Sequence, residues 1–111
     1  IPGDRVSVLY VLGRYSDTGT SSPEELMPMF QATDAGVVWS VCGFGAAEGA
    51  CMLLAADLGG HARVGFENNM QLANGKLALD NSALVAQLAS GIGGLQRRIA
   101  SGSEARVFLG L

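Results

Sequence analysis

Charged residues are scarce in this sequence, and no charge of either sign forms a block. Of the 111 residues only 15% are charged, against about 25% in an average domain. Seven lysines and arginines stand against ten aspartates and glutamates, so the net charge is −3. This balance argues against nucleic acid or an anionic membrane surface as the main partner. No uncharged apolar run reaches the roughly 18 residues that a membrane span needs.

Metal-binding and redox side chains are also few. His61 is the only histidine, and Cys42 and Cys51 lack the spacing of a metal-binding pair. The chain alone therefore cannot supply a complete zinc site. We expect both cysteines to be reduced and buried, which favours the cytoplasm; a disulfide or a nucleophilic role is the alternative.

Apolar residues, in contrast, are abundant for so small a chain. They make up 49% of the sequence, and a small domain has a large surface to cover relative to its volume. We therefore expect something else to cover part of the surface, either further segments of a longer protein or a second copy in a homo-oligomer. The sequence begins Ile1-Pro2-Gly3 without a methionine, and we expect it to be a piece of a longer protein.

Strand and helix signals alternate along the chain. Apolar, β-branched runs predict strands near residues 6–12, 37–42 and 62–67. Caps and glycine stops predict helices that begin after Ser22, cover 46–58, extend from an Asn81 cap over 82–90, and run from Ser101 to Leu109. This alternation predicts an α/β fold with a parallel sheet, the first two strands being buried on both faces. Such units occur both in doubly wound sheets and in (βα)8 barrels.

In both folds, ligands bind in the loops at the C-terminal ends of the strands. The candidate loops are residues 13–21, 43–48 and 67–76. The Gly43-Phe44-Gly45 turn could let an anion approach backbone N–H groups at the start of the next helix. It lacks the rest of a dinucleotide fingerprint, and a turn that needs glycine only for its geometry is the alternative.

The run from Gly60 to Asn69, GHARVGFENN, carries the strongest functional signal. If it forms a regular strand, Arg63 and Glu67 point to one face and Asn68 to the other. A buried guanidinium and carboxylate on one face are costly unless they pair or bind a ligand or metal. Two interpretations remain open at this point: a structural Arg63–Glu67 ion pair and a ligand site.

The same run resembles the β-keto acid cleavage enzymes, the family first described as 3-keto-5-aminohexanoate cleavage enzyme. The matching residues are Trp39-Ser40-Val41, the stretch Gly59-Gly60-His61 followed by Arg63-Val64-Gly65-Phe66-Glu67-Asn68-Asn69, and Gly75, Asn81, Val85 and Ala105-Arg106. The resemblance implies that the three strands are the last three βα units of a TIM (βα)8 barrel, with helices outside. Residues 1–111 would then form the C-terminal part of a single TIM-barrel domain.

The resemblance also implies a function and roles for three residues. Family members use zinc or another divalent metal, held by a His-x-His pair on an early strand, which is absent here, and by a glutamate that matches Glu67. Their arginine, which helps to activate the substrate, matches Arg63. Their aspartate that works with this arginine in proton abstraction is replaced here by Asn68, and an amide is not a general base.

The reaction implied is the exchange of acyl groups between a small-molecule β-keto acid and acetyl-CoA, giving acetoacetate and a new acyl-CoA. The chain would take part only with the missing N-terminal barrel segment and would be inactive alone. The alternative is a non-catalytic α/β module with a structural or interaction role.

Overall fold

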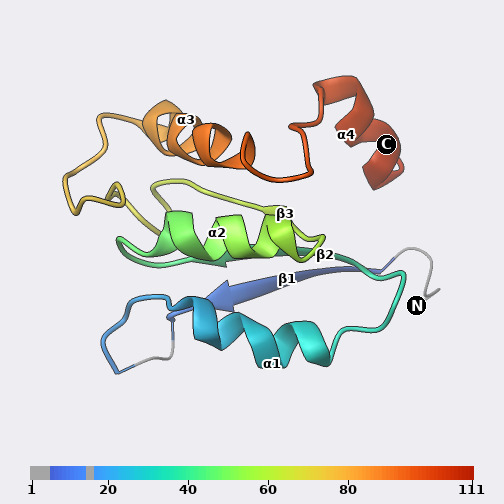
Figure 1. Cartoon of the computed structure of the whole chain (residues 1–111), viewed down its shortest axis with the longest axis horizontal. Coiled ribbons are helices and arrows are strands. Elements are labelled where there is room, and N and C mark those ends of the chain that lie inside the picture. The colour runs from blue at the N-terminus through green and yellow to red at the C-terminus, as the bar shows by residue number, and fades with distance from the viewer. Residues whose placement is uncertain (1–5, 15–16) are drawn as a thin grey trace.

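The protein forms a three-stranded parallel sheet with helices, which is the α/β fold that the sequence predicts (Figure 1). A computed structural model describes residues 6–14 and 17–111, so the expected start at Ile1-Pro2-Gly3 and part of loop 13–21 lie outside the described residues. The strands are β1 (Ser7–Leu12), β2 (Val38–Gly43) and β3 (His61–Ala62), in the order β1-β2-β3. Because β1 and β3 both pair with β2 in parallel, the carboxyl ends of these three strands meet at one edge of the sheet.

Helices follow each strand. A short 3-10 helix, η2 (Pro23–Glu25), leads into α1 (Leu26–Gln31) after β1, and α2 (Glu48–Asp57) follows β2. Two helices follow β3: α3 (Asn81–Ile92) and α4 (Gly102–Leu109). Within residues 6–14 and 17–111, no helix is both long and apolar enough to cross a bilayer.

The core lies between one face of the sheet and the helices α1 and α2. Alternation along β2 turns Trp39 and Val41 toward the helices, where they meet Leu26 and Met52. All four side chains are buried, and each contributes about 1.5–3 kcal/mol by leaving water. Cys42 and Cys51 are buried as well, as predicted.

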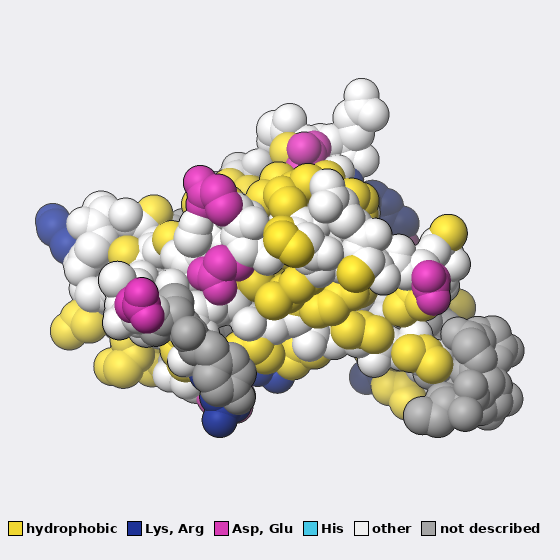
Figure 2. Space-filling view, turned by 90° about the horizontal axis from the view of Figure 1, so that it is seen from below, with side chains coloured by type: hydrophobic (Ala, Val, Ile, Leu, Met, Phe, Trp, Pro, Cys, Tyr) yellow, Lys and Arg dark blue, Asp and Glu magenta, His cyan; other side chains and the backbone are white. Residues whose placement is uncertain are grey.

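The opposite face of β1 is not covered by the described chain, so the prediction that this strand is buried on both faces is wrong. Leu9 is 40% exposed, whereas Leu12 at the end of the same strand is buried. β1 is also a free edge of the sheet. Figure 2 shows hydrophobic side chains gathered on the surface over α1 and β1, the lowest elements in Figure 1.

The third strand is much shorter than the predicted 62–67. β3 contains only His61 and Ala62, and the backbone N–H of Arg63 makes a last bond to the Val41 carbonyl, at 2.9 Å. The chain then turns, because Gly65 has φ +156° and its carbonyl accepts from the N–H groups of residues 68 and 69. Side chains were expected to alternate between the two sheet faces over residues 62–67, and this alternation ends where β3 ends, at Ala62.

The cap of α3 also differs from its prediction. Asp80, not Asn81, accepts the cap hydrogen bond from the Ala83 N–H, at 2.9 Å. Asn81 is the first helical residue, and its Oδ1 accepts from the Phe66 N–H at 2.8 Å. The helix continues past Ser90 to Ile92.

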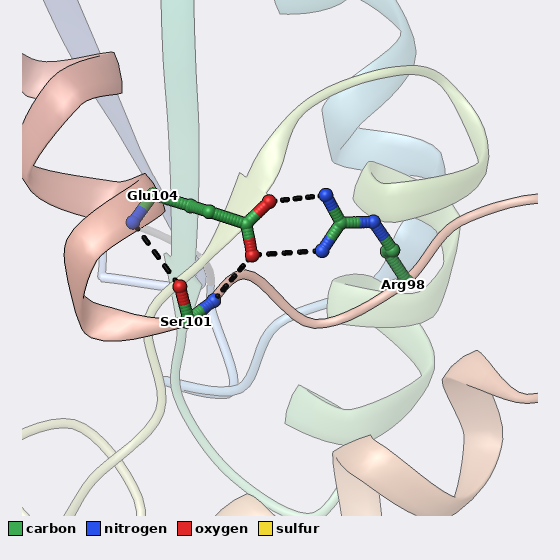
Figure 3. Close-up of polar contacts among 3 residues, drawn as sticks. All are labelled: Arg98, Ser101 and Glu104. Carbon is green, nitrogen blue, oxygen red and sulfur yellow. Dashed lines mark hydrogen bonds and ion pairs between the residues drawn. The ribbon is translucent and has the colours of Figure 1, made fainter.

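The last helix matches its predicted bounds and its capping box. Ser101 Oγ accepts from the Glu104 N–H, while Glu104 Oε1 accepts from the Ser101 N–H and from Arg98 (Figure 3). The ring of Phe108 on α4 meets His61 edge-on, with centroids 4.6 Å apart. Since His61 pairs with Ser40 in the parallel register, α4 lies against the sheet face opposite the core, near the N-terminal ends of β2 and β3.

Candidate functional site

The segment 63–69, which we call the site loop, leaves β3 at the C-terminal edge of the sheet. It brings together two of the three predicted site residues: Arg63 Nη2 donates to Asn68 Oδ1 at 3.2 Å. The same nitrogen donates to the buried Cys42 Sγ at 3.4 Å, so the guanidinium lies over the end of β2. Asn68 would point away from Arg63 only in a regular strand, and the chain instead turns at Gly65, which lets Asn68 reach Arg63.

Glu67 lies at the rim of this arrangement. Its Oε2 is 4.0 Å from Arg63 Nη2, and the two side chains are 82% and 48% exposed. The premise of a buried pair is therefore wrong. An exposed pair at this distance contributes at most about 1 kcal/mol, so structural stabilisation is a weak reason for the two charges to be here. Both remain open to a ligand from the C-terminal side.

Two polar side chains hold the site loop from the helices, and the sequence analysis missed both roles. From α3, Asn81 Oδ1 binds the Phe66 N–H. From α2, Glu48 Oε1 accepts from Asn69 Nδ2 at 3.0 Å. Glu48 is 1% exposed, and this burial raises the pKa of its carboxyl, while the hydrogen bond from Asn69 and, to a smaller extent, the nearby Gly65 backbone oppose the shift. Asn69 following Asn68 was the available signal, because consecutive amides in a loop commonly bind backbone or side-chain groups.

The loop after β1 packs against the glycine turn Gly43-Phe44-Gly45 at the end of β2. A Cβ on Gly45, which has φ +83°, would lie 2.8 Å from Thr20 Cγ2. The Phe44 carbonyl accepts both the N–H and the Oγ–H of Ser21, at 2.7 Å each. These contacts favour the interpretation of Gly43-Phe44-Gly45 as a turn that needs glycine for close packing rather than for an anion.

The residues of the site loop fit one position of a metal site. The Glu67 carboxylate is a hard oxygen donor and is largely exposed. Among residues 6–14 and 17–111, however, no three His, Cys, Asp or Glu side chains come together in a way that could hold a metal ion. Glu67 can thus act as one ligand, and further ligands would have to come from elsewhere.

A cavity of the described structure lies away from the site loop. It measures about 1260 Å³ and opens between the N-terminal ends of the strands and α4, with Val38, His61 and Phe108 in its lining. Burial, and secondarily the charge of Arg97, lowers the pKa of His61 there. The exposed surface of this cavity is mostly apolar.

Comparison with known proteins gives the class. The beta-keto acid cleavage enzyme family matches residues 1–111. The chain is 37% identical over 92 residues to a 3-keto-5-aminohexanoate cleavage enzyme of Fusobacterium nucleatum, a match that covers 83% of this chain and 34% of that protein. It is 37% identical over 73 residues to a 3-oxoadipate:acetyl-CoA acetyltransferase of Cupriavidus necator, covering 66% of this chain and 26% of that protein.

A third relative extends the same group. A 3,5-dioxohexanoate:acetyl-CoA acetone transferase of Paraburkholderia graminis is 34% identical over 93 residues, 80% of this chain and 30% of that protein. The chain therefore belongs to the β-keto acid cleavage enzyme family, which confirms the resemblance found in the sequence. It spans about a third or less of the length of the curated relatives it matches.

Proposed function

We propose that this chain is the C-terminal part of a metal-dependent β-keto acid cleavage enzyme that works on a (βα)8 barrel. The complete protein exchanges acyl groups between a β-keto acid and acetyl-CoA, giving acetoacetate and a new acyl-CoA. The observation that carries this proposal is the contact between Arg63 and Asn68 at 3.2 Å, with Glu67 beside it, at the C-terminal edge of a parallel sheet. That edge is where (βα)8 enzymes bind substrates.

The barrel part of the proposal rests on three features. The strand order is sequential, the core helices α1 and α2 lie on one face, and the other face of β1 is exposed. A second cavity, of about 420 Å³, lies between β3 and α3 beside the free edge of β3. Preceding barrel strands would pair with both free edges and cover the exposed face, and closure would remove the edges altogether.

Arg63 is the group that we assign to the substrate anion. Its guanidinium is held by Cys42 Sγ and Asn68 Oδ1 through one nitrogen, and five N–H donors are available on such a group. The remaining donors can bind the carboxylate of the β-keto acid, or the enolate that develops when its C2 proton leaves. The hydrogen bond that Arg63 donates to Asn68 Oδ1 would fix the orientation of the guanidinium.

Glu67 is the residue that we assign to the metal. Its exposed carboxylate stands beside Arg63, so an anion bound to Arg63 would also face Glu67's ligand position. A divalent metal held there would act as a Lewis acid on the keto oxygen. The other ligands would come from earlier barrel strands.

Asn68 occupies the position at which an aspartate would serve as the base. Its Oδ1 accepts from Arg63, and a neutral amide cannot take the C2 proton. We infer that the base is another group of the complete barrel. If no such group exists, the chain serves a non-catalytic role, and the departure at Asn68 is the observation that favours this second candidate.

The test is an isotope experiment on the complete protein. The C2 carbanion of the β-keto acid would take the acetyl group from acetyl-CoA, and the original acyl group would leave C2 and join the released CoA thiolate. Acetyl-CoA labelled in its acetyl carbons should therefore give acetoacetate labelled at C3 and C4, together with an unlabelled acyl-CoA. Label that stays in acetyl-CoA with every β-keto acid tried would refute the enzyme proposal.

A further inference from the structure

Glu48 is a buried ionisable side chain that the proposed reaction does not use. It is the first residue of α2 and is 1% exposed. Its Oε1 accepts from Asn69 Nδ2 at 3.0 Å. Its Oε2 is buried without a hydrogen-bond partner among the described residues. A carboxyl group with one unsatisfied buried oxygen lowers stability, and such exceptions often mark a functional constraint.

Asn69 transmits this contact to the whole site loop. Its backbone N–H donates to the Gly65 carbonyl at 3.0 Å, which closes the turn. Its side chain binds both backbone groups of Gln71, donating to the carbonyl at 2.7 Å and accepting from the N–H at 2.9 Å. A shift of Asn69 would therefore move the turn that carries Glu67 and Asn68.

The rest of the loop has little packing of its own. Arg63, Phe66 and Glu67 are exposed, whereas Asn69 is 5% exposed. The position of the exposed functional side chains thus depends on a few polar contacts, of which the Glu48–Asn69 bond is the one buried on both sides. Polar contacts of this kind fix catalytic groups more closely than solvent-exposed ones can.

We propose that Glu48 is a positioning residue: through Asn69 it holds the site loop in the geometry that places Arg63, Glu67 and Asn68 for the β-keto acid reaction. This inference rests on the proposed function. It assigns Glu48 no contact with substrate, and it requires the hydrogen bond rather than the negative charge.

Swapping the carboxylate at position 48 and the amide at position 69 tests this proposal in the complete protein. Asn69→Asp places a second carboxylate opposite that of Glu48. This variant should lower kcat about tenfold to a hundredfold, as small misplacements of catalytic groups do. The effect on KM should be smaller. Glu48→Gln alone keeps an acceptor oxygen for Asn69 and should stay near the wild-type kcat. Glu48→Gln combined with Asn69→Asp restores a donor opposite an acceptor and should recover the part of the loss that comes from the contact with residue 48, while the bond from residue 69 to the Gln71 carbonyl stays lost. Asp57→Asn, at the exposed end of the same helix, is the matched control.

Hydrogen exchange of the peptide covering residues 64–72 supplies a readout that does not need turnover. The hydrogen-exchange rate there should rise in Asn69→Asp and fall back toward the wild-type rate in the double variant. Residues 26–31 of α1 report whether the fold is intact. If Asn69→Asp does not fold, Asn69→Ala replaces it. A wild-type protein that forms no acetoacetate would refute the proposed function, with exchange still testing the contact. Loss of kcat in Glu48→Gln alone, or restored loop protection without restored kcat, would overturn the positioning role.

Discussion

The two ends of the sheet hold their charges in different ways. At the N-terminal end, Arg98 and Glu104 form a two-bond pair over the start of α4, and hydrogen bonds from Arg98 and Ser101 lower the pKa of Glu104 to about 2 (Figure 3). At the C-terminal edge, Arg63 binds a neutral amide at 3.2 Å and stands 4.0 Å from Glu67. Arg98 and Glu104 satisfy each other's hydrogen bonds, and Glu104 also caps α4. The looser group keeps donors and a carboxylate free for a ligand, so strength of pairing is a poor guide to function here.

Removing each arginine in turn should separate the two ends most clearly. In the complete protein, Arg63→Ala should lower kcat/KM about a hundredfold or more, equivalent to about 3 kcal/mol, because one charge-stabilising donor is lost from the transition state. Arg63→Lys should restore little, since an ammonium lacks the planar fork. Steady-state kinetics with acetyl-CoA and a β-keto acid give the measurement.

Arg98→Ala is the matched control for this comparison. It removes a more exposed arginine from the other end, 74% against 48% for Arg63, and should leave kcat/KM within about threefold of wild type, the range expected of a surface substitution distant from the chemistry. Equal losses in the two variants would show that the C-terminal edge is not special, and the Arg63–Glu67 pair would then be structural.

Replacing each glutamate should sharpen the comparison for the metal. Glu67→Gln turns a carboxylate ligand into an amide. The affinity of the complete protein for the metal should fall about tenfold to a hundredfold, in line with the loss of one ligand from a set of three or four. The metal content of the purified protein should fall as a result. Glu104→Gln should leave the metal content unchanged. Metal analysis by mass spectrometry decides the outcome, and an unchanged ratio of metal to protein in Glu67→Gln would remove this residue from the site.

The difference between the two ends also shows what the sequence could predict. The α4 capping box was predictable because Ser101 and Glu104 interact within one turn, and local hydrogen bonds leave a clear pattern. The strands β1 and β2 were predictable within one residue from their apolar runs. The site loop was not, because period-2 alternation was assumed through Gly65, whose φ of +156° ends the strand direction.

The remaining site contacts are long-range, and for this reason the sequence did not reveal them. Glu48 and Asn69 are 21 residues apart, and Phe66 and Asn81 are 15 apart. Asn81 also satisfied the pattern of a helix cap, but Asp80 takes that role and Asn81 binds the site loop instead. Family resemblance named Arg63, Glu67 and Asn68 without their geometry, while the polar contacts around them required the structure.

Asn68→Asp tests whether the site loop has lost a base. The new carboxylate would lie 3.2 Å from Arg63 Nη2 if the geometry is kept, where it could take a proton from C2 of a bound β-keto acid. We expect kcat to rise. The rise should be about tenfold if another group already acts as base, and about a hundredfold or more if none does, because a well-placed base contributes that much. Initial rates over a range of pH measure this. A fall in kcat would identify Asn68 as a substrate-binding amide.

The smallest expected effect lies at the N-terminal end and concerns pH. The pKa of Glu104 falls from its ordinary value of 4.5 to about 2 in the folded protein, mainly through Arg98 and then through Ser101. A carboxyl whose pKa is lowered by folding stabilises the fold fully above pH 4.5 and loses this contribution as the pH falls toward 2. The group is exposed, so salt should weaken the effect. Hydrogen exchange of residues 102–109, corrected for intrinsic rates, should therefore increase across this window in wild type but change little in Glu104→Gln, where the capping interaction no longer titrates. The site loop should show no parallel change, and identical pH responses in wild type and Glu104→Gln would contradict the assignment of this pair to the α4 cap.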